Sequence, residues 1–186
     1  TYFDYFLSIE TYFTTLVVSL ILGFGLLYLG KNSIKKINYF DQLVLIISTY
    51  FLITILIAIP FYLSNYQVTL VNSIFEATSG LTGTGFSIFK NIKYLDPTLI
   101  LWRSSSQWIG GLYFLLFIII IFSNKTFNYK MTDLVYSGDS SYKSEENIKE
   151  NIIKIIIIYF VLSLIIFTLL NISGLRLFNS LNMSMT

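Results

Sequence analysis

A short run of threonine and glycine is the part of this sequence whose residue types could do chemistry. It consists of Thr82, Gly83, Thr84 and Gly85, and we call these residues the TGTG segment. Glycine lets the backbone bring its carbonyl groups close to a ligand, and threonine adds a hydroxyl oxygen. Hard cations prefer oxygen ligands. The segment is therefore a candidate alkali-cation site, and an ordinary glycine-rich turn is the alternative.

Several other kinds of site are excluded by composition. The sequence contains no cysteine and no histidine, which excludes disulfides, thiolate or imidazole metal sites, and catalysis by those side chains. The ten acidic residues are scattered along the chain. We therefore predict that the chain is not an enzyme and has no catalytic residue and no covalent cofactor. A net charge of +2 is too small for nucleic-acid binding.

Two charged residues lie in otherwise apolar sequence near the TGTG segment. They are Glu76 and Arg103, and charges at membrane depth are costly unless they are paired or near water. We predict that the two interact and support the TGTG segment from behind, with Glu76 outside the ion path. The alternative is that each side chain reaches the outer membrane surface separately.

The elements that must position these residues are membrane-spanning helices. Of the 186 residues, 55% are hydrophobic and only 12% are charged, whereas soluble domains carry about 25% charged residues. A spanning helix needs roughly 20 apolar residues, and four windows qualify: residues 12–30, 43–64, 99–122 and 152–171. The predicted fold class is an all-α membrane protein.

A fifth apolar stretch, residues 68–79, is too short to span. It has helical periodicity, and at about 18 Å it would reach halfway across a bilayer. The residues on one face are Val68, Val71, Ile74, Phe75 and Thr78. A short re-entrant pore helix followed by an extended selectivity-filter loop is one arrangement in which irregular backbone is tolerated at membrane depth. Carbonyl groups of such a loop can replace the hydration shell of a cation, and the helix C-terminus adds partial negative charge.

The lysines predict the orientation of the chain. Lys31, Lys35 and Lys36 place residues 31–40 in the cytoplasm by the positive-inside rule. Residues 1–11 then lie outside, and residues 125–150 form a second cytoplasmic loop. This polar loop is either a surface connector or a docking surface for a cytoplasmic partner.

An internal repeat emerges when the chain is aligned with itself at an offset of about 107 residues. The second span then falls on the fourth, and residues 71–74 fall on residues 178–181. The expected organisation is a leading helix and turn (1–40), a first span, pore-helix, filter and span unit (41–124), the cytoplasmic loop (125–150) and the start of a second unit (151–186). We therefore expect the chain to be a fragment that stops inside its second pore helix.

Gly110 and Gly111 follow three serines in the third span. Small residues allow membrane helices to approach closely, so we predict a helix-packing role for both glycines. A gating hinge is the alternative.

The combined motifs resemble those of the Trk/Ktr/HKT superfamily of potassium transporters. The resemblance covers residues 41–186 and is carried by Ile59-Pro60-Phe61, by residues 75–85, by Leu101-Trp102-Arg103 and by residues 107–111. It implies four such units around a pseudo-fourfold axis, with Thr82, Gly83, Thr84 and Gly85 forming one quarter of a potassium filter. Glycine at position 85 favours potassium over sodium. Two residues depart from the family pattern: Gly83 stands where Thr or Val is frequent, and Tyr113 where bacterial members often have a third glycine.

The resemblance also implies a location and partners. The full-length protein would lie in the cell (inner) membrane and take up potassium ions as its transported substrate. It would pair as a homodimer and work with a cytoplasmic nucleotide-binding regulatory subunit. Two other functions stay open: a single-unit cation channel subunit that assembles as a tetramer, and a structural membrane subunit that transports nothing.

Overall fold

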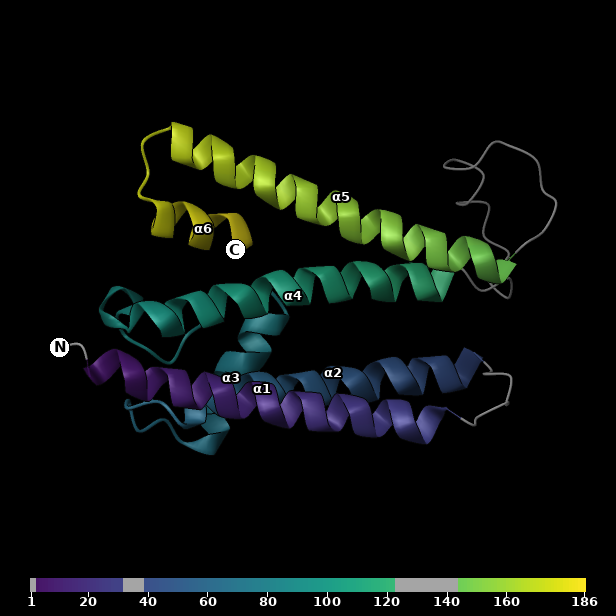
Figure 1. Ribbon diagram of the computed structural model, residues 1–186, viewed down its shortest axis with the longest axis horizontal. Coiled ribbons are helices and arrows are strands. Elements are labelled where there is room, and N and C mark those ends of the chain that lie inside the picture. Colours follow the sequence, from purple (N-terminus) through teal and green to yellow (C-terminus); the bar gives the residue numbers. More distant parts are fainter. Residues whose placement is uncertain (1–2, 32–38, 123–143) are drawn as a thin grey trace.

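The computed structural model describes residues 3–31, 39–122 and 144–186, and the described parts are helical apart from short connections. Figure 1 shows four long helices lying side by side and two short helices between them. The elements in chain order are α1 (Phe3–Gly30), α2 (Tyr39–Tyr62), α3 (Leu70–Leu81), a 3-10 turn η1 (Ile92–Tyr94), α4 (Pro97–Phe122), α5 (Ser144–Ile172) and α6 (Leu177–Met185).

The four long helices agree with the four predicted spans. Their apolar stretches, long enough to cross a membrane, are Glu10–Gly30, Phe40–Tyr62, Pro97–Ile120 and Glu150–Ile172. Most of their large hydrophobic side chains are exposed, and none of the apolar window of α5 is buried. Such a surface suits lipid rather than water, so the prediction of a multi-pass, all-helical membrane protein is confirmed at this level.

The two predicted cytoplasmic segments lie mostly outside the described residues. Residues 32–38 and 123–143 belong to that part of the chain. The last residues of the predicted loop 125–150 are helical, because α5 begins at Ser144, whereas its apolar window begins at Glu150. An exposed ion pair links Lys154 Nζ to Glu150 Oε2 at 3.6 Å, and this spacing of four residues supports the first turns of a helix.

The short helix α3 is shifted by two residues from the predicted range 68–79. Thr69 is its N-cap, and the Thr69 hydroxyl accepts a hydrogen bond from the backbone N–H of Asn72. Threonine in this role satisfies one of the free N–H groups of the first turn. At the other end Gly80 does not stop the helix, which continues to Leu81. The cap at Thr69 therefore fixes the start of α3, which apolar periodicity alone did not locate.

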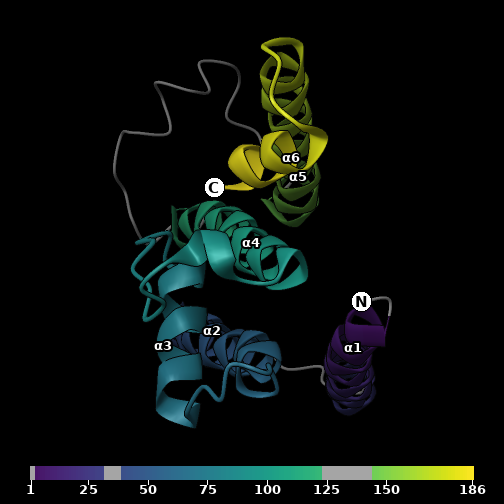
Figure 2. The same ribbon diagram turned by 90° about the vertical axis from the view of Figure 1, so that its left-hand side faces the viewer.

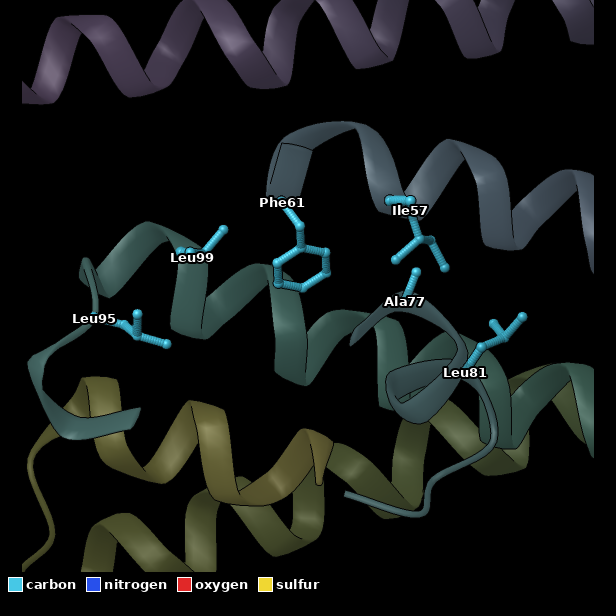
Figure 3. Close-up of a cluster of buried hydrophobic side chains, with 7 residues drawn as sticks. Ile57, Phe61, Ala77, Leu81, Leu95 and Leu99 are labelled. Carbon is cyan, nitrogen blue, oxygen red and sulfur yellow. The ribbon is translucent and has the colours of Figure 1, made fainter. Parts of the chain in front are cut away.

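The hydrophobic core lies where the end of α2, the helix α3 and the start of α4 meet (Figure 3). Phe61 and Ala77 are completely buried at its centre, and Leu81 and Leu99 pack around them. Pro60, just before Phe61, lies inside α2 and cannot donate to the carbonyl of Leu56. The core thus holds α3 between the two spans that flank it in sequence.

The apolar face of α3 is not the face that is buried. Val71 is 74% exposed and Phe75 is 47% exposed, whereas Ser73 and Glu76 are completely buried. The buried face carries small side chains, which let α3 approach α4 closely. Packing geometry therefore outweighed hydrophobicity in choosing this face.

Substitution of Gly80 tests this close approach. A Cβ at position 80 would overlap the hydroxyl oxygen of Ser106 and lie 3.2 Å from its Cβ. The Ser106 hydroxyl, which donates to Arg103 O at 2.6 Å, would have to rotate away. We expect Gly80→Ala to lower the free energy of unfolding by about 1 kcal/mol or more, and Ser106→Gly to restore much of it. Thermal unfolding of the purified single and double variants measures both effects; additive losses would contradict the contact.

The second pair of helices, α5 and α6, repeats the order of α2 and α3. The first residues of α3 and α6, Leu70 and Leu177, are 107 positions apart. Gln67 and Gly174, which are separated by the same offset, both have positive φ (51° and 93°). The two connections into the short helices therefore share a positive φ at matching positions. Figure 2 shows α6 between α4 and α5, and α1 beside α2.

Candidate functional site

The TGTG segment begins directly after the C-terminal end of α3, and its residues are exposed. Gly83 and Gly85 have φ values of 68° and 74°, in the left-handed region that favours glycine. Gly83 stands where the family pattern often has Thr or Val, and a backbone with this φ would strain either of those residues. The carbonyl oxygens of Thr82, Gly83 and Thr84 accept no hydrogen bond from any other described residue. Three backbone oxygens are thus free to bind a cation.

The threonine hydroxyls of this segment turn back toward the end of α3. Thr82 Oγ1 donates to the carbonyl of Thr78 at 2.8 Å. Thr84 Oγ1 lies 3.2 Å from both Ser79 Oγ and Thr82 Oγ1. These hydroxyls therefore stabilise the turn, and the backbone carbonyls are the better candidates for cation ligands.

Glu76 and Arg103, the two charges predicted to interact, are in contact. Arg103 Nε lies 3.2 Å from Glu76 Oε2, and both side chains are almost completely buried. The second carboxylate oxygen, Oε1, accepts from Ser87 Oγ at 2.7 Å and from the backbone N–H of Ile88 at 2.6 Å. The carboxylate therefore ties the loop that follows the TGTG segment to α3.

The guanidinium group of Arg103 also binds the backbone at the end of the TGTG segment and at the start of the loop that follows it. Its Nη2 donates to the carbonyl of Gly85 at 2.6 Å and to that of Phe86 at 3.3 Å. Ser79 Oγ donates to the same Phe86 carbonyl at 2.6 Å. A carbonyl oxygen has two lone pairs, so Gly85 O keeps one that Arg103 does not use. The charged pair thus lies behind the loop and holds it by its backbone.

Gly110 and Gly111 lie where other elements approach α4 most closely. A Cβ at Gly110 would overlap the carbonyl oxygen of Leu81 and lie 2.8 Å from its Cα, and a Cβ at Gly111 would lie 2.6 Å from the hydroxyl of Tyr159. The Tyr159 hydroxyl donates to the carbonyl of Trp108 at 3.0 Å. Gly110 therefore brings the last turn of α3 against α4, and Gly111 does the same for α5.

Tyr113, at the second departure from the family pattern, packs against α2. Its hydroxyl donates to the carbonyl of Ile46 at 2.5 Å and lies 2.7 Å from Thr49 Oγ1. Its ring centroid is 5.9 Å from that of Tyr50. The larger side chain is thus accommodated by a polar contact between two spans.

The serines before these glycines contact both short helices. Ser106 faces Gly80 of α3, whereas the Ser104 hydroxyl donates to Asn182 Oδ1 of α6 at 2.9 Å in a buried contact. Ser105 Oγ lies 3.8 Å from Met185 Sδ, also in α6. The N-terminal half of α4 therefore separates α3 from α6.

A cavity of about 840 Å³ lies between α2, α4, α5 and the ends of the two short helices. Leu81, Thr82 and Gly83 line it at the end of α3, and residues 184–186 line it at the end of α6. None of its described lining residues carries a charge. A helix C-terminus is worth about half a negative charge, so the end of α3 favours a cation in the cavity.

Some contributors to this site were missed by the sequence reasoning. Ser79 and Ser87 bond the loop, and Gln107 lines the cavity next to Gly85. Gln107 lies four residues after Arg103 and so on the same helix face, which could have identified it. The serines carry no comparable signal, because their partners are distant in sequence.

Known proteins resemble this chain over most of its length. A family model for TrkH, described as a cation transport protein, matches residues 8–179. An uncharacterized cation transporter of Methanocaldococcus jannaschii is 31% identical over 133 residues, or 69% of this chain. The Trk system potassium uptake protein TrkG of Escherichia coli is 28% identical over 56% of the chain, and TrkI of Halomonas elongata is 40% identical over 30%.

The match covers only part of each relative. The aligned segments span 27%, 22% and 11% of the lengths of those three proteins, in the same order. No solved structure matches the chain.

Proposed function

Because this chain belongs to the TrkH family of cation transport proteins, we propose that it is part of a potassium uptake protein. Its TGTG segment would form one strand of the selectivity filter, and α3 would be the re-entrant pore helix that carries it. Potassium would lose its hydration shell to backbone carbonyls and pass down its electrochemical gradient. The names of the relatives from Escherichia coli and Halomonas elongata, both potassium uptake proteins, favour potassium as the ion.

The observation that carries this proposal is that the C-terminal end of α3 and the start of the TGTG segment line one uncharged cavity. The end of α3 supplies partial negative charge there. Free carbonyl oxygens of Thr82 and Gly83 lie at the same place. A neutral cavity with a negative helix end and free carbonyls stabilises a cation without binding it as tightly as carboxylates would.

The charged pair would stabilise the filter without entering the ion path. Glu76 and Arg103 bond the loop from behind and are absent from the cavity's described lining. In this role they position Gly85 and the residues after it, while Gly110 and Gly111 set the distances between α4 and its neighbours.

The whole protein would contain several such units. The matching starts of α3 and α6, each preceded by a residue of positive φ, support the predicted division of the chain. Its parts are a leading helix (1–40), a first unit (41–124), a loop (125–150) and a second unit from residue 151. The matching starts also favour several units in one chain over a single-unit tetrameric channel. Residues 1–11 would lie outside, and residues 31–40 and 125–150 in the cytoplasm. A homodimer and a cytoplasmic nucleotide-binding subunit remain part of the proposal.

Rescue of growth tests this function. The full-length protein that contains this chain is expressed in a bacterium lacking its own potassium uptake systems, and growth is measured at low potassium. We expect rescue by the wild type and none by Gly85→Asp, which adds a charge and strain where φ is 74°. Asn91→Asp adds the same charge at an exposed position of the next loop and should rescue growth fully. Rescue by Gly85→Asp at equal protein level would refute the filter assignment.

A further inference from the structure

Gln107 lies on the face of α4 that supports the TGTG segment. It follows Arg103 by four residues and precedes Gly110 by three, so the three residues lie one above another on the helix. Arg103 bonds the carbonyl of Gly85, and Gly110 contacts the last turn of α3. Between them lies Gln107, whose amide nitrogen is 3.9 Å from the position that a Cβ on Gly85 would take.

The Gln107 amide has no hydrogen-bond partner in the described part of the chain. Its Oε1 is buried and unpartnered, and neither end of the amide bonds another described residue. An unsatisfied buried amide costs about 1–3 kcal/mol, and leucine would fill the same volume without that cost. A polar side chain at this place therefore calls for a polar partner.

Candidate partners are peptide groups of the TGTG segment, whose first residues line the same cavity as Gln107. The backbone N–H groups of Thr84 and Gly85 bond no other described residue, and neither do the carbonyls of Gly83 and Thr84. A glutamine amide both donates and accepts, and a single water can bridge it to a peptide group across such a gap. The amide can therefore hold the strand in position, directly or through one water.

We propose that Gln107 is a positioning residue that sets the discrimination between potassium and sodium, an inference that rests on the proposed filter role of the TGTG segment. Selectivity of a carbonyl filter depends on cavity size and on the number and field of its carbonyls. A strand with two glycines at positive φ is flexible and needs support from behind to keep those carbonyls in place. Arg103 fixes the carbonyl of Gly85, and Gln107 supports the same end of the strand from the next turn of α4.

The test compares uptake of the two ions by the full-length protein in phospholipid vesicles. Potassium uptake is measured with increasing sodium as competitor for the wild type, Gln107→Leu and Gln107→Glu. Loss of one hydrogen bond is worth up to about tenfold. We expect Gln107→Leu to lower the preference for potassium by about that factor, with a raised KM for potassium. Ser105→Ala, on the same helix but facing α6, serves as the control and should keep the wild-type ratio.

Each outcome is decisive for one of the two proposals. A wild-type ratio in Gln107→Leu would overturn the role of Gln107 while leaving potassium uptake intact. Absence of potassium uptake by the wild type would instead overturn the proposed function. If Gln107→Leu does not fold, Gln107→Glu is the test variant, because it keeps the size and an acceptor but loses the donor. An unaltered preference for potassium over sodium in that variant also overturns the inference.

Discussion

Replacement of Gly110 by alanine should abolish ion uptake and destabilise the protein by about 3 kcal/mol, near the upper end of the usual cost of overpacking. The added Cβ would overlap backbone atoms of Leu81, and backbone cannot move aside as a flexible side chain can. The last turn of α3 would have to separate from α4, and Thr82 and Gly83 would move with it. Thermal unfolding of the purified full-length protein and potassium uptake at equal protein level measure the two effects.

Two other glycines provide a graded control. Gly111→Ala should cost less, because the added Cβ meets the hydroxyl of Tyr159 at the far end of a side chain, and Tyr159→Phe should relieve it. Gly25→Ala in α1 meets nothing within 4 Å and should leave stability unchanged or slightly raised, since alanine is the better helix former. Equal effects at Gly110 and Gly25 would show that the contact between α3 and α4 is not tight.

Breaking the Glu76–Arg103 pair is expected to have the other large effect. Arg103→Met leaves the completely buried carboxylate of Glu76 without a countercharge, and loss of one partner of a buried ion pair costs about 3–5 kcal/mol. It also removes both guanidinium bonds to the loop, at Gly85 O and Phe86 O. Unfolding midpoints and potassium uptake should therefore both fall, with uptake lost even in the fraction that folds.

A double variant distinguishes the interaction between Glu76 and Arg103 from the bonds that each makes with other residues. Glu76→Gln keeps an oxygen that can accept from Ser87 and Ile88, and combined with Arg103→Met it leaves no buried charge. The double variant should be more stable than the sum of the two single losses implies, because residues in contact are not additive. Lys154→Met breaks the exposed pair with Glu150 and should cost at most about 0.5 kcal/mol. Strict additivity at Glu76 and Arg103 would contradict their coupling.

The TGTG segment is held chiefly from one side. Glu76, Arg103 and Ser79 bond the backbone of the following loop, and the carbonyls of Thr82 to Thr84 are left unbonded by the described chain. Such an arrangement fixes the strand without occupying the oxygens that a cation would need. A charged pair can lie so close to the proposed cation site because the pair is neutral as a whole and lies behind the strand.

The family, the class of function and the spans could all be predicted from the sequence. Membership of the TrkH family confirms the resemblance to potassium transporters and the prediction that the chain is not an enzyme. Hydrophobic runs predicted the four long helices, and the 107-residue offset predicted a second short helix that includes residues 178–181, which lie within α6. The roles of Thr82, Gly83, Thr84 and Gly85 in ion selection stay predictions.

Contacts between distant segments could not be read from the sequence in the same way. Apolar periodicity in α3 suggested a face containing Val71 and Phe75, yet the face with Ser73 and Glu76 is buried. The bonds from Arg103 to Gly85 and from Glu76 to Ile88 join residues 18 and 12 positions apart. No pattern of spacing in the sequence predicts them. Gln107 was missed although its spacing of four residues from Arg103 places both on one face of α4.

The low charge, the long apolar runs and the alternating glycines by themselves determined a membrane protein with a flexible, carbonyl-rich segment. These are local properties, because hydropathy and backbone freedom belong to each residue wherever the chain folds. Only the tertiary structure decided which small residues meet, that Gly80 and Gly110 bring α3 against α4, and that the ends of α3 and α6 share a cavity. Such contacts depend on the relative placement of whole helices, which is set by close packing across the molecule and not by neighbours in sequence.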